Sequence, residues 1–209
     1  GADELCFLDI DASYENRSAT LSTVEAVASQ VFIPLTVGGG VSKLQDIEKL
    51  LEKGADKVSI NTSAILDPSL VTSAAKKFGS QCIVVAVDSK REGEKSYVYT
   101  HGGKNKTAFE TSAWIKIVEG EGAGEILLTS MDRDGTKIGF DNELTSSIAK
   151  DLSIPLITSG GAGSIDHMIE GITDGKADAV LAASIFHQKE ITIAEVKDGL
   201  ASKGIEVRL

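Results

Sequence analysis

Short apolar runs alternate along this chain with stretches of helical period, and no other feature restricts the fold as much. The alternation is typical of strand–helix units that build a parallel sheet. The apolar runs lack strict polar–apolar alternation, as expected when helices cover a sheet or when the sheet closes on itself. We expect strands near residues 4–10, 33–37, 56–60, 81–88, 124–130, 154–158 and 178–182. We expect helices near residues 18–30, 42–53, 67–78, 109–120, 142–151, 164–173 and 192–202.

The chain also repeats itself. A Gly-Ala-Asp-like lead introduces four of the strands, at Gly1, Gly54, Gly122 and Lys176. A shift of 122 residues (160 − 38 = 122) aligns Val37-Gly38-Gly39-Gly40 with Ser159-Gly160-Gly161-Ala162, and Asn61-Thr62 with Ala183-Ser184. Such a recurrence indicates two half-barrels from a duplicated unit, approximately residues 1–121 and 122–209.

Together these patterns predict one α/β domain over residues 1–209, a (β/α)8 TIM barrel of the phosphate-binding type. Only seven βα units are recognisable, so we expect the first βα unit of the barrel to be missing, with its place ahead of Gly1. A charged segment after the fourth strand is expected to lead into a small hairpin near residues 96–100.

Local signals place the helix boundaries. Ser42, Asp67-Pro68 and Ser164 are plausible helix starts. Gly54, Gly79 and Gly175 are expected at helix ends, where a left-handed residue is favoured.

Composition and charge exclude several classes of partner. The formal charge of −10 argues against nucleic acid and anionic membranes, because a polyanion would be repelled. No apolar run approaches the roughly 18 residues of a membrane span and no secretory signal is recognisable, so a cytoplasmic location is expected. Cys6 and Cys82 lie in apolar segments and are expected to pack as reduced side chains. The histidines lack metal-ligand spacing and no dinucleotide fingerprint occurs, so neither a metal nor another cofactor is expected.

Two glycine loops stand where an expected strand ends and a helix begins, around Gly38-Gly39-Gly40 and Gly160-Gly161. Backbone N–H groups converge at such points, and a Cβ would keep a phosphate from the main chain. Tight turns without a ligand would suit one such loop equally well. Two loops in matching halves favour a long substrate with a phosphate at each end, lying across the mouth of the barrel.

Carboxylates at expected strand ends are candidates for proton transfer. Asp88 ends the apolar run of residues 84–88, and a carboxylate at the lip of a barrel is well placed as a general acid or base. Asp9 ends another strand, and Asp132 and Asp134 follow a third. Helix capping or turn formation explains Asp9 and Asp132 equally well.

Charged residues also stand at the opposite ends of the strands. Glu4, Lys57 and Glu125 occupy equivalent positions in the repeated lead. A solvated rim is the ordinary interpretation. The alternative is a charged gate, since opposite charges facing inward would need each other as partners.

The motifs together resemble one family, the cyclase subunit of imidazole glycerol phosphate synthase in histidine biosynthesis. The resemblance rests on Phe32-Ile33-Pro34-Leu35-Thr36-Val37-Gly38-Gly39-Gly40, on Asp56-Lys57-Val58-Ser59-Ile60-Asn61-Thr62, on residues 124–137 with Asp132-Arg133-Asp134-Gly135-Thr136, on Ser159-Gly160-Gly161-Ala162-Gly163 and on Ala182-Ala183-Ser184-Ile185-Phe186-His187. The related phosphoribosylformimino isomerase shares the glycine loops but not the long block that follows Thr129.

The resemblance implies a role for each matching residue. Asp88 would be one of two catalytic aspartates. One phosphate would be held by Gly40, Asn61 and Thr62, and the other by Gly160, Gly161, Ala183 and Ser184. Asp9, Ser59, Gln81, Thr129, Asp134 and Ser159 would line the site between them.

The resemblance also implies a partner. A glutaminase subunit would supply ammonia through the barrel as part of a heterodimer, with Glu4, Lys57 and Glu125 as gate charges and Asp56 facing the partner. The family's other catalytic aspartate and a fourth gate charge, an arginine, would lie ahead of Gly1. Two alternatives stay open: an inactive phosphate-binding or glutaminase-docking protein, and the related isomerase.

Overall fold

A computed structural model describes residues 1–8 and 21–208, and its centre is a curved parallel sheet. The strands run in the order β1-β2-β3-β4-β7-β8-β9, so each next unit adds its strand beside the last. Their bounds are β1 Leu5–Leu8, β2 Leu35–Gly38, β3 Lys57–Ile60, β4 Ile83–Glu92, β7 Glu125–Ser130, β8 Leu156–Ser159 and β9 Ala179–Leu181. The seven strands expected from the sequence are therefore present, as is the expected α/β barrel-like fold.

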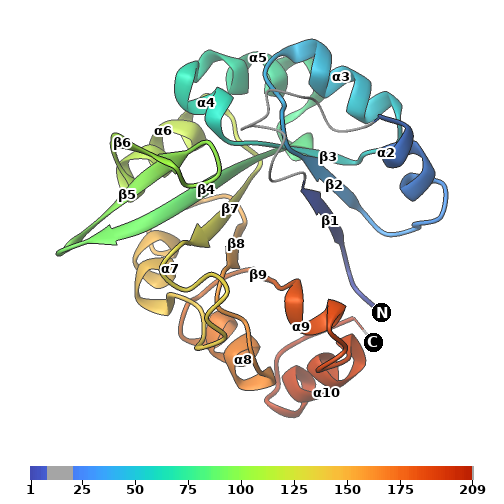
Figure 1. Ribbon diagram of the computed structural model, residues 1–209, viewed down its shortest axis with the longest axis vertical. Helices are drawn as coiled ribbons and strands as arrows, with labels where there is room; N and C mark the ends of the chain where they lie inside the picture. Colours follow the sequence, from blue (N-terminus) through green and yellow to red (C-terminus); the bar gives the residue numbers. More distant parts are fainter. Residues whose placement is uncertain (9–20, 209) are drawn as a thin grey trace.

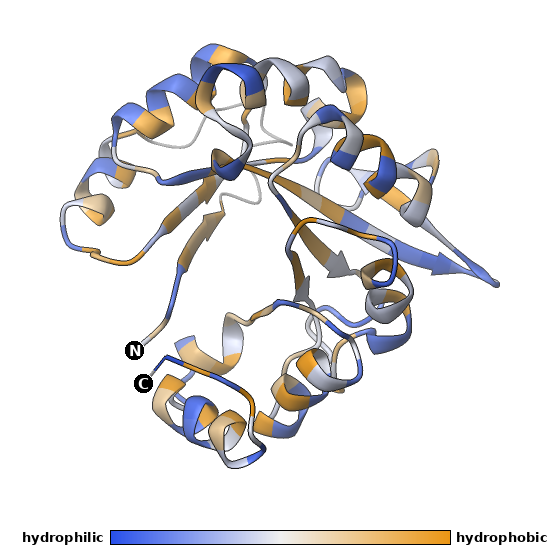
Figure 2. Ribbon diagram, turned by 180° about the vertical axis from the view of Figure 1, so that it is seen from behind, coloured by the Kyte–Doolittle hydropathy of each residue, from blue (hydrophilic) through white to orange (hydrophobic). Residues whose placement is uncertain are grey.

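Helices surround the sheet on its outer side and leave the strands around a central space (Figure 1). The larger helices are α2 Leu21–Ala28, α3 Leu44–Glu52, α5 Ser69–Phe78, α6 Thr111–Glu121, α7 Asn142–Ala149, α8 Ile165–Thr173 and α10 Ile193–Ser202. The strands are mostly hydrophobic and the helices carry both kinds of residue, as a two-layer packing requires (Figure 2).

A hairpin arm extends from β4, as the charged segment predicted. β4 continues outward and pairs with antiparallel β5 (Lys95–Thr100), which in turn pairs with β6 (Asn105–Glu110). The far end of the arm is hydrophilic (Figure 2). The arm begins at Asp88, which lies within β4 and not at its end as expected, and which is paired with Tyr99 of β5.

Three short elements escape the sequence pattern. They are α4 (Thr62–Leu66), α9 (Ser184–His187) and the 3-10 turn Ser80–Cys82. Each is too short to show a helical period, so hydrophobic periodicity cannot detect it.

The helix-boundary predictions are partly correct. The Ser164 hydroxyl accepts a hydrogen bond from His167 N, and Asp67 accepts from Ser69 N. Ser42 is wrong as a capping acceptor, because its hydroxyl donates to Asp46 Oδ2. Gly175 is wrong as the left-handed residue, which is Lys176 at φ 58°.

The duplicated register needs one correction. The left-handed pairs are Gly39–Gly40 and Gly160–Gly161, so the loops match at a shift of 121, not 122. The same shift relates α3 to α8 (165 − 44 = 121). From α4 and α9 onward the shift is 122 (184 − 62 = 122). The second copy thus has one extra residue between α8 and β9, where Lys176 takes a left-handed conformation.

Matching hydrogen bonds support the duplication. Asp56 Oδ2 accepts from Leu35 N at 2.8 Å, and Asp178 Oδ2 accepts from Leu156 N at 2.9 Å. Each aspartate thereby ties the start of one strand to the start of its neighbour.

The buried hydrophobic residues form two clusters. The larger contains residues between Val24 and Leu156, including the fully buried Trp114. The smaller packs Phe140, Met168, Ile185, Val196 and Leu200 around α8, α9 and α10.

Cys6 and Cys82 are free thiols, as expected. Burial raises the pKa of the Cys6 thiol to about 11.

The ring of strands is open between β1 and β9. Among the described residues, β1 pairs with β2 and β9 pairs with β8, so each has one unpaired edge. Leu5 and Leu8 of β1 are 37% and 40% exposed. Both chain ends lie beside this opening (Figure 1), where Lys197 of α10 contacts Asp3 at 2.8 Å. In the described part of the chain no helix is long and apolar enough to cross a membrane.

Candidate functional site

The sheet register brings polar residues together at the carboxyl ends of three neighbouring strands. Asp88 of β4 is paired with Thr129 of β7, and Thr129 with Ser159 of β8. Residues at one level of a parallel sheet point to the same face, so these three side chains form one row. Ser59 of β3 is level with Val84, four residues before Asp88, and is buried on that same face.

Asp88 is held by a side chain from the next strand end. Asn61 Nδ2 donates to Asp88 Oδ2 at 2.9 Å. Burial raises the pKa of the Asp88 carboxyl, the hydrogen bond from Asn61 opposes that shift, and the charge of Asp134 adds to it. A raised pKa makes this carboxyl a better proton donor than a free aspartic acid would be at neutral pH, and general acid–base chemistry depends on such groups.

The Asn61 contact predicts a measurable change in Asp88. We expect Asn61→Leu to raise the pKa of Asp88 further, because the variant removes a donor that stabilises the charged carboxylate. The ¹³Cγ chemical shift of Asp88, followed by NMR against pH, measures the change. Asn105→Leu on the exposed hairpin is the control and should leave the Asp88 titration unchanged. A pKa that falls or stays constant in Asn61→Leu would contradict this assignment.

The first expected phosphate site is assembled by β2 and β3. Gly38 is paired with Ser59, and Gly40 and Asn61 each follow two residues later, so the two loops are neighbours. Gly39 and Gly40 have φ of 109° and 66°, a region that favours glycine. The Thr62 hydroxyl accepts from His101 N at 3.0 Å, which ties this loop to the hairpin arm.

The second expected phosphate site is assembled in the same way by β8 and β9. Ser159 is paired with Leu181, and Gly161 and Ala183 each follow two residues later. Ala183 precedes α9 as Asn61 precedes α4, with φ of −125° at both positions. The register therefore puts Gly160 and Gly161 on the strand end next to that of Ala183 and Ser184.

The second glycine loop has a packing role that the sequence argument missed. A Cβ at Gly160 would lie 2.7 Å from Ser130 O, and one at Gly161 only 2.2 Å from Gly139 O. Gly139 N also donates to Gly161 O at 2.8 Å. These glycines are therefore required by the chain's own backbone after β7, whether or not a phosphate binds.

The starts of the two helices that follow the glycine loops are capped by the chain itself. Asp46 Oδ2 accepts from Ser42 N at 3.0 Å and Lys43 N at 3.2 Å at the start of α3. His167 Nδ1 accepts from Gly163 N at 3.2 Å near the start of α8. An anion at either site would accordingly be bound by the glycine loops and strand ends, not by these helix starts.

A charged cluster occupies the opposite end of the barrel. Lys57 Nζ contacts Glu4 Oε2 at 2.9 Å and Glu125 Oε1 at 2.5 Å. Lys57 and Glu125 side chains are each 15% exposed, so the solvated-rim interpretation fails for these two. Burial alone would lower the pKa of Lys57, but the hydrogen bonds to Glu125 and Glu4 outweigh it and raise that pKa.

Removing the cation should destabilise the protein. We expect Lys57→Met to lower the free energy of unfolding at pH 7 by about 2–4 kcal/mol, since it leaves Glu4 and Glu125 without their partner. Urea unfolding at pH 7 measures the loss.

The matched control is Lys53→Met, whose partner Glu25 is 61% exposed. That variant should change stability by no more than about 1 kcal/mol. Equal losses in the two variants would refute the cluster's role.

Not every expected site residue joins the row at the strand ends. Gln81 lies before β4, beside the level of Asp56, and is exposed, so it belongs to the charged end of the barrel and not to the mouth. Sequence reasoning misplaced it. Asp56 has a structural role beside the partner-facing one expected of it, because its carboxylate accepts a hydrogen bond from Leu35 N. Asp9 lies outside the described residues.

Asp132 and Asp134 have different surroundings. Asp132 Oδ2 accepts from Arg91 N at 2.7 Å, so it joins the segment after β7 to the hairpin arm. Asp134 lies against the second glycine loop, since a Cβ at Gly160 would be 3.4 Å from its Cβ. Within residues 1–8 and 21–208, no group of three or more His, Cys, Asp and Glu side chains is placed to hold a metal ion.

Most of the chain, including the residues of both ends of the barrel, matches one protein-family model. A protein-family model described as "Histidine biosynthesis protein" matches residues 1–192 of the chain. The match includes both glycine loops, Asp88 and the charged cluster.

Proposed function

The chain belongs to the histidine biosynthesis protein family, whose members are enzymes of that pathway, and from this premise we propose that it is the cyclase subunit of imidazole glycerol phosphate synthase. The observation that carries the proposal is the position of Asp88. It is a partly buried carboxyl with a raised pKa, in a row with Thr129 and Ser159, and the two matched glycine loops follow β2 and β8 at the same edge of the sheet.

In the proposed reaction ammonia adds to phosphoribulosyl-formimino-aminoimidazole carboxamide ribotide. The adduct loses the carbonyl oxygen as water, closes to imidazole glycerol phosphate and releases aminoimidazole carboxamide ribotide, which makes the enzyme a lyase. Proton transfers accompany both the addition and the ring closure, and Asp88 is the described residue best placed to carry them. Asn61 orients the Asp88 carboxyl through its 2.9 Å hydrogen bond.

The substrate has a phosphate at each end, which suits two separated anion sites. Gly40, Asn61 and Thr62 would hold one phosphate; Gly160, Gly161, Ala183 and Ser184 would hold the other. Thr129, Asp134, Ser159 and Ser59 would contact the part of the substrate between them. No cofactor is required, because the reaction proceeds by proton transfer and addition.

We further propose that a glutaminase subunit docks at the charged end of the barrel and supplies the ammonia. Lys57 faces Glu4 and Glu125 there, and Asp56 and Gln81 lie at the same end. Ammonia entering between these charges would reach Asp88 along the inner face of the strands. Phe32, which is 94% exposed in the segment before β2, lies at this end as well.

One more strand–helix unit would complete the barrel. Within the described part of the chain, β1 and β9 each have an unpaired edge, and a parallel strand between them would bond to both. A groove of about 540 Å³ along α2, lined by Ser22, Thr23, Ala26, Val27, Gln30 and Val31, has the apolar and small residues that a packed helix needs. We propose that such a unit occupies the opening in the active enzyme.

A second candidate function follows from the same opening. With the ring incomplete, the chain could bind phosphates or the glutaminase without performing catalysis. The third candidate, the phosphoribosylformimino isomerase, has the same family assignment and the same glycine loops.

Turnover assays separate the three. The purified chain, alone and with an added strand–helix unit, is supplied with ammonium salt and the cyclase substrate, and imidazole glycerol phosphate is measured. The cyclase proposal predicts ammonia-dependent product. Phosphate-ligand binding without turnover in either preparation would favour the non-catalytic protein, and turnover of the isomerase substrate without ammonia would favour the isomerase.

A further inference from the structure

The segment of residues 131–141, here named the Asp134 loop, connects β7 to α7 and carries the carboxylate that acts on Asp88. Asp134 N and Arg133 N both donate to Ser130 O, at 2.9 and 3.1 Å, so the loop begins with a tight turn. Asp134 then lies against Gly160 of the second glycine loop. The conformation of this loop therefore decides where the Asp134 carboxylate stands.

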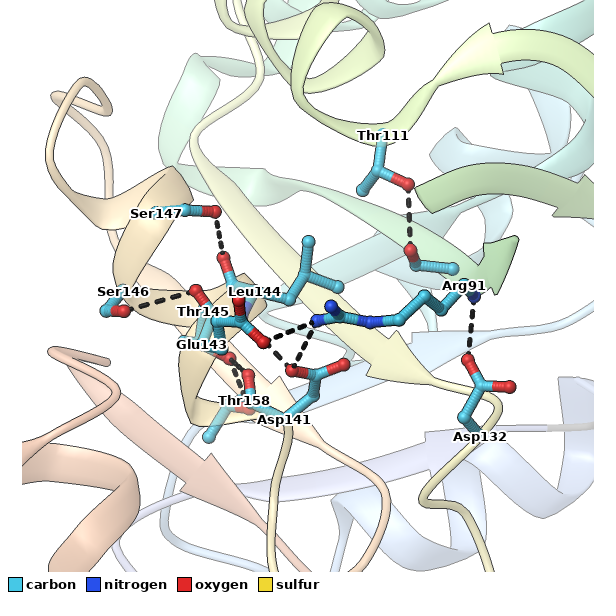
Figure 3. A network of polar contacts seen from close by, with 11 residues as sticks. Arg91, Thr111, Asp132, Asp141, Glu143, Leu144, Thr145, Ser146, Ser147 and Thr158 are labelled. Atoms are coloured by element: carbon cyan, nitrogen blue, oxygen red, sulfur yellow. Dashed lines mark hydrogen bonds and ion pairs between the residues drawn. The ribbon is translucent and has the colours of Figure 1, made fainter. Parts of the chain in front are cut away.

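The main chain of β4 holds the beginning of the loop. Met131 N donates to Ser89 O at 2.8 Å, and Asp132 Oδ2 accepts from Arg91 N at 2.7 Å. Both contacts come from the part of β4 that leads into the hairpin arm, and Figure 3 shows the contact between Arg91 and Asp132.

The side chain of Arg91 holds the other end of the loop. Its Nη2 lies 3.4 Å from Asp141 Oδ1 and 3.1 Å from Glu143 Oε2 (Figure 3). Asp141 is itself anchored, since its Oδ1 accepts from Leu144 N and its carbonyl from the Thr145 hydroxyl. The guanidinium thus connects the hairpin arm to a rigid helix start.

We propose that Arg91 is a positioning residue that clamps both ends of the Asp134 loop and so fixes the Asp134 carboxylate relative to Asp88 and the second glycine loop. Its main chain holds Asp132 and its side chain holds Asp141, one at each end of the loop. The proposal rests on the proposed function for its catalytic meaning.

Titration of Asp88 tests the clamp directly. Arg91→Met removes the guanidinium but keeps the main-chain contact to Asp132. Among the described residues, Asn61 from β3 and Asp134 from the loop are the groups that act on the Asp88 carboxyl. If the loop loosens, the Asp134 carboxylate repels the Asp88 carboxylate less. The pKa of Asp88, measured from its ¹³Cγ chemical shift, should then fall. Loss of a nearby cation alone would raise that pKa.

A double-mutant cycle shows whether the effect passes through Asp134. Asp134→Asn should lower the pKa of Asp88. In a protein that already carries Asp134→Asn, Arg91→Met should change that pKa no further. Lys90→Met, a neighbour on the same arm whose ammonium lies over the Tyr99 ring, is the matched control and should leave Asp88 unchanged. Amide hydrogen exchange at Arg133 and Asp134 should speed up about tenfold in Arg91→Met only.

Three results would overturn the clamp: an unchanged Asp88 titration in Arg91→Met, a shift to higher pH, or additive shifts in the double variant. If Arg91→Met unfolds, Glu143→Gln is the milder variant, because it removes the exposed partner and keeps Asp141. The titration needs no turnover. Its failure is therefore separate from failure of the cyclase proposal, which absence of product would reveal.

Discussion

Asp88→Asn should reduce the ammonia-dependent turnover number by roughly 100-fold to 10,000-fold, the range typical of a general acid or base, with little change in KM. The variant keeps the shape of the side chain and a contact to Asn61, but it can no longer exchange a proton. The limb of the pH profile that reports Asp88 ionisation should disappear with it. Steady-state kinetics across pH, on the preparation that forms imidazole glycerol phosphate, measure both effects.

The control for this prediction is Asp132→Asn. Asp132 accepts from Arg91 N and has a structural role, so its loss should change turnover by less than about tenfold. If Asp88→Asn keeps more than a tenth of the activity, or shows the same pH profile as the unchanged enzyme, Asp88 is not the proton-transfer group.

Closing the open side of the barrel should raise the melting temperature by about 10 °C or more. An added strand would pair with β1 and β9, cover Leu5 and Leu8, and place its helix in the groove along α2. Burial of this size is worth several kcal/mol, and for a chain of this length each kcal/mol corresponds to about 2–4 °C. Circular dichroism melting of the chain, with and without the unit fused ahead of Gly1, measures the gain.

The connection decides where the unit must be fused. A strand followed by a helix and then a parallel strand crosses over with right-handed geometry, so the unit has to lead into β1. The matched control carries the same unit with a proline in the middle of its strand, which removes a ladder hydrogen bond. Equal melting temperatures for all three proteins would show that the opening does not accept a strand.

The sequence could predict the sheet and the strand-end residues because both depend on local patterns. Buried strands are apolar runs, and parallel strands bring their carboxyl ends to one edge of the sheet. Asp88, Asn61 and Gly161 could therefore be placed at that edge from the sequence alone. The repeated strand lead placed Glu4, Lys57 and Glu125 together at the opposite edge, but it favoured a solvated rim, which is wrong for Lys57 and Glu125. Both placements are consequences of position along a strand.

Features set by contacts between distant segments could not be predicted. Nothing local marks Arg91 as the partner of both Asp132 and Asp141, which lie 41 and 50 residues away. The second half has one extra residue near Lys176, so the alignment of the two halves changes by one residue after α8. The backbone angles of the glycine pairs revealed this change. Gln81 was assigned to the mouth by resemblance alone, although it precedes its strand.

The central claim is that two matched cradles, one in each half of the ring, bind the two phosphates of one molecule. The most direct measurement is an NMR titration of the ¹⁵N-labelled protein with the bis-phosphorylated substrate in the absence of ammonia. We predict that the amide signals of Gly40, Asn61 and Thr62 shift together with those of Gly161, Ala183 and Ser184, with one shared dissociation constant. Shifts confined to one loop, or two sets of shifts with independent dissociation constants, would contradict it.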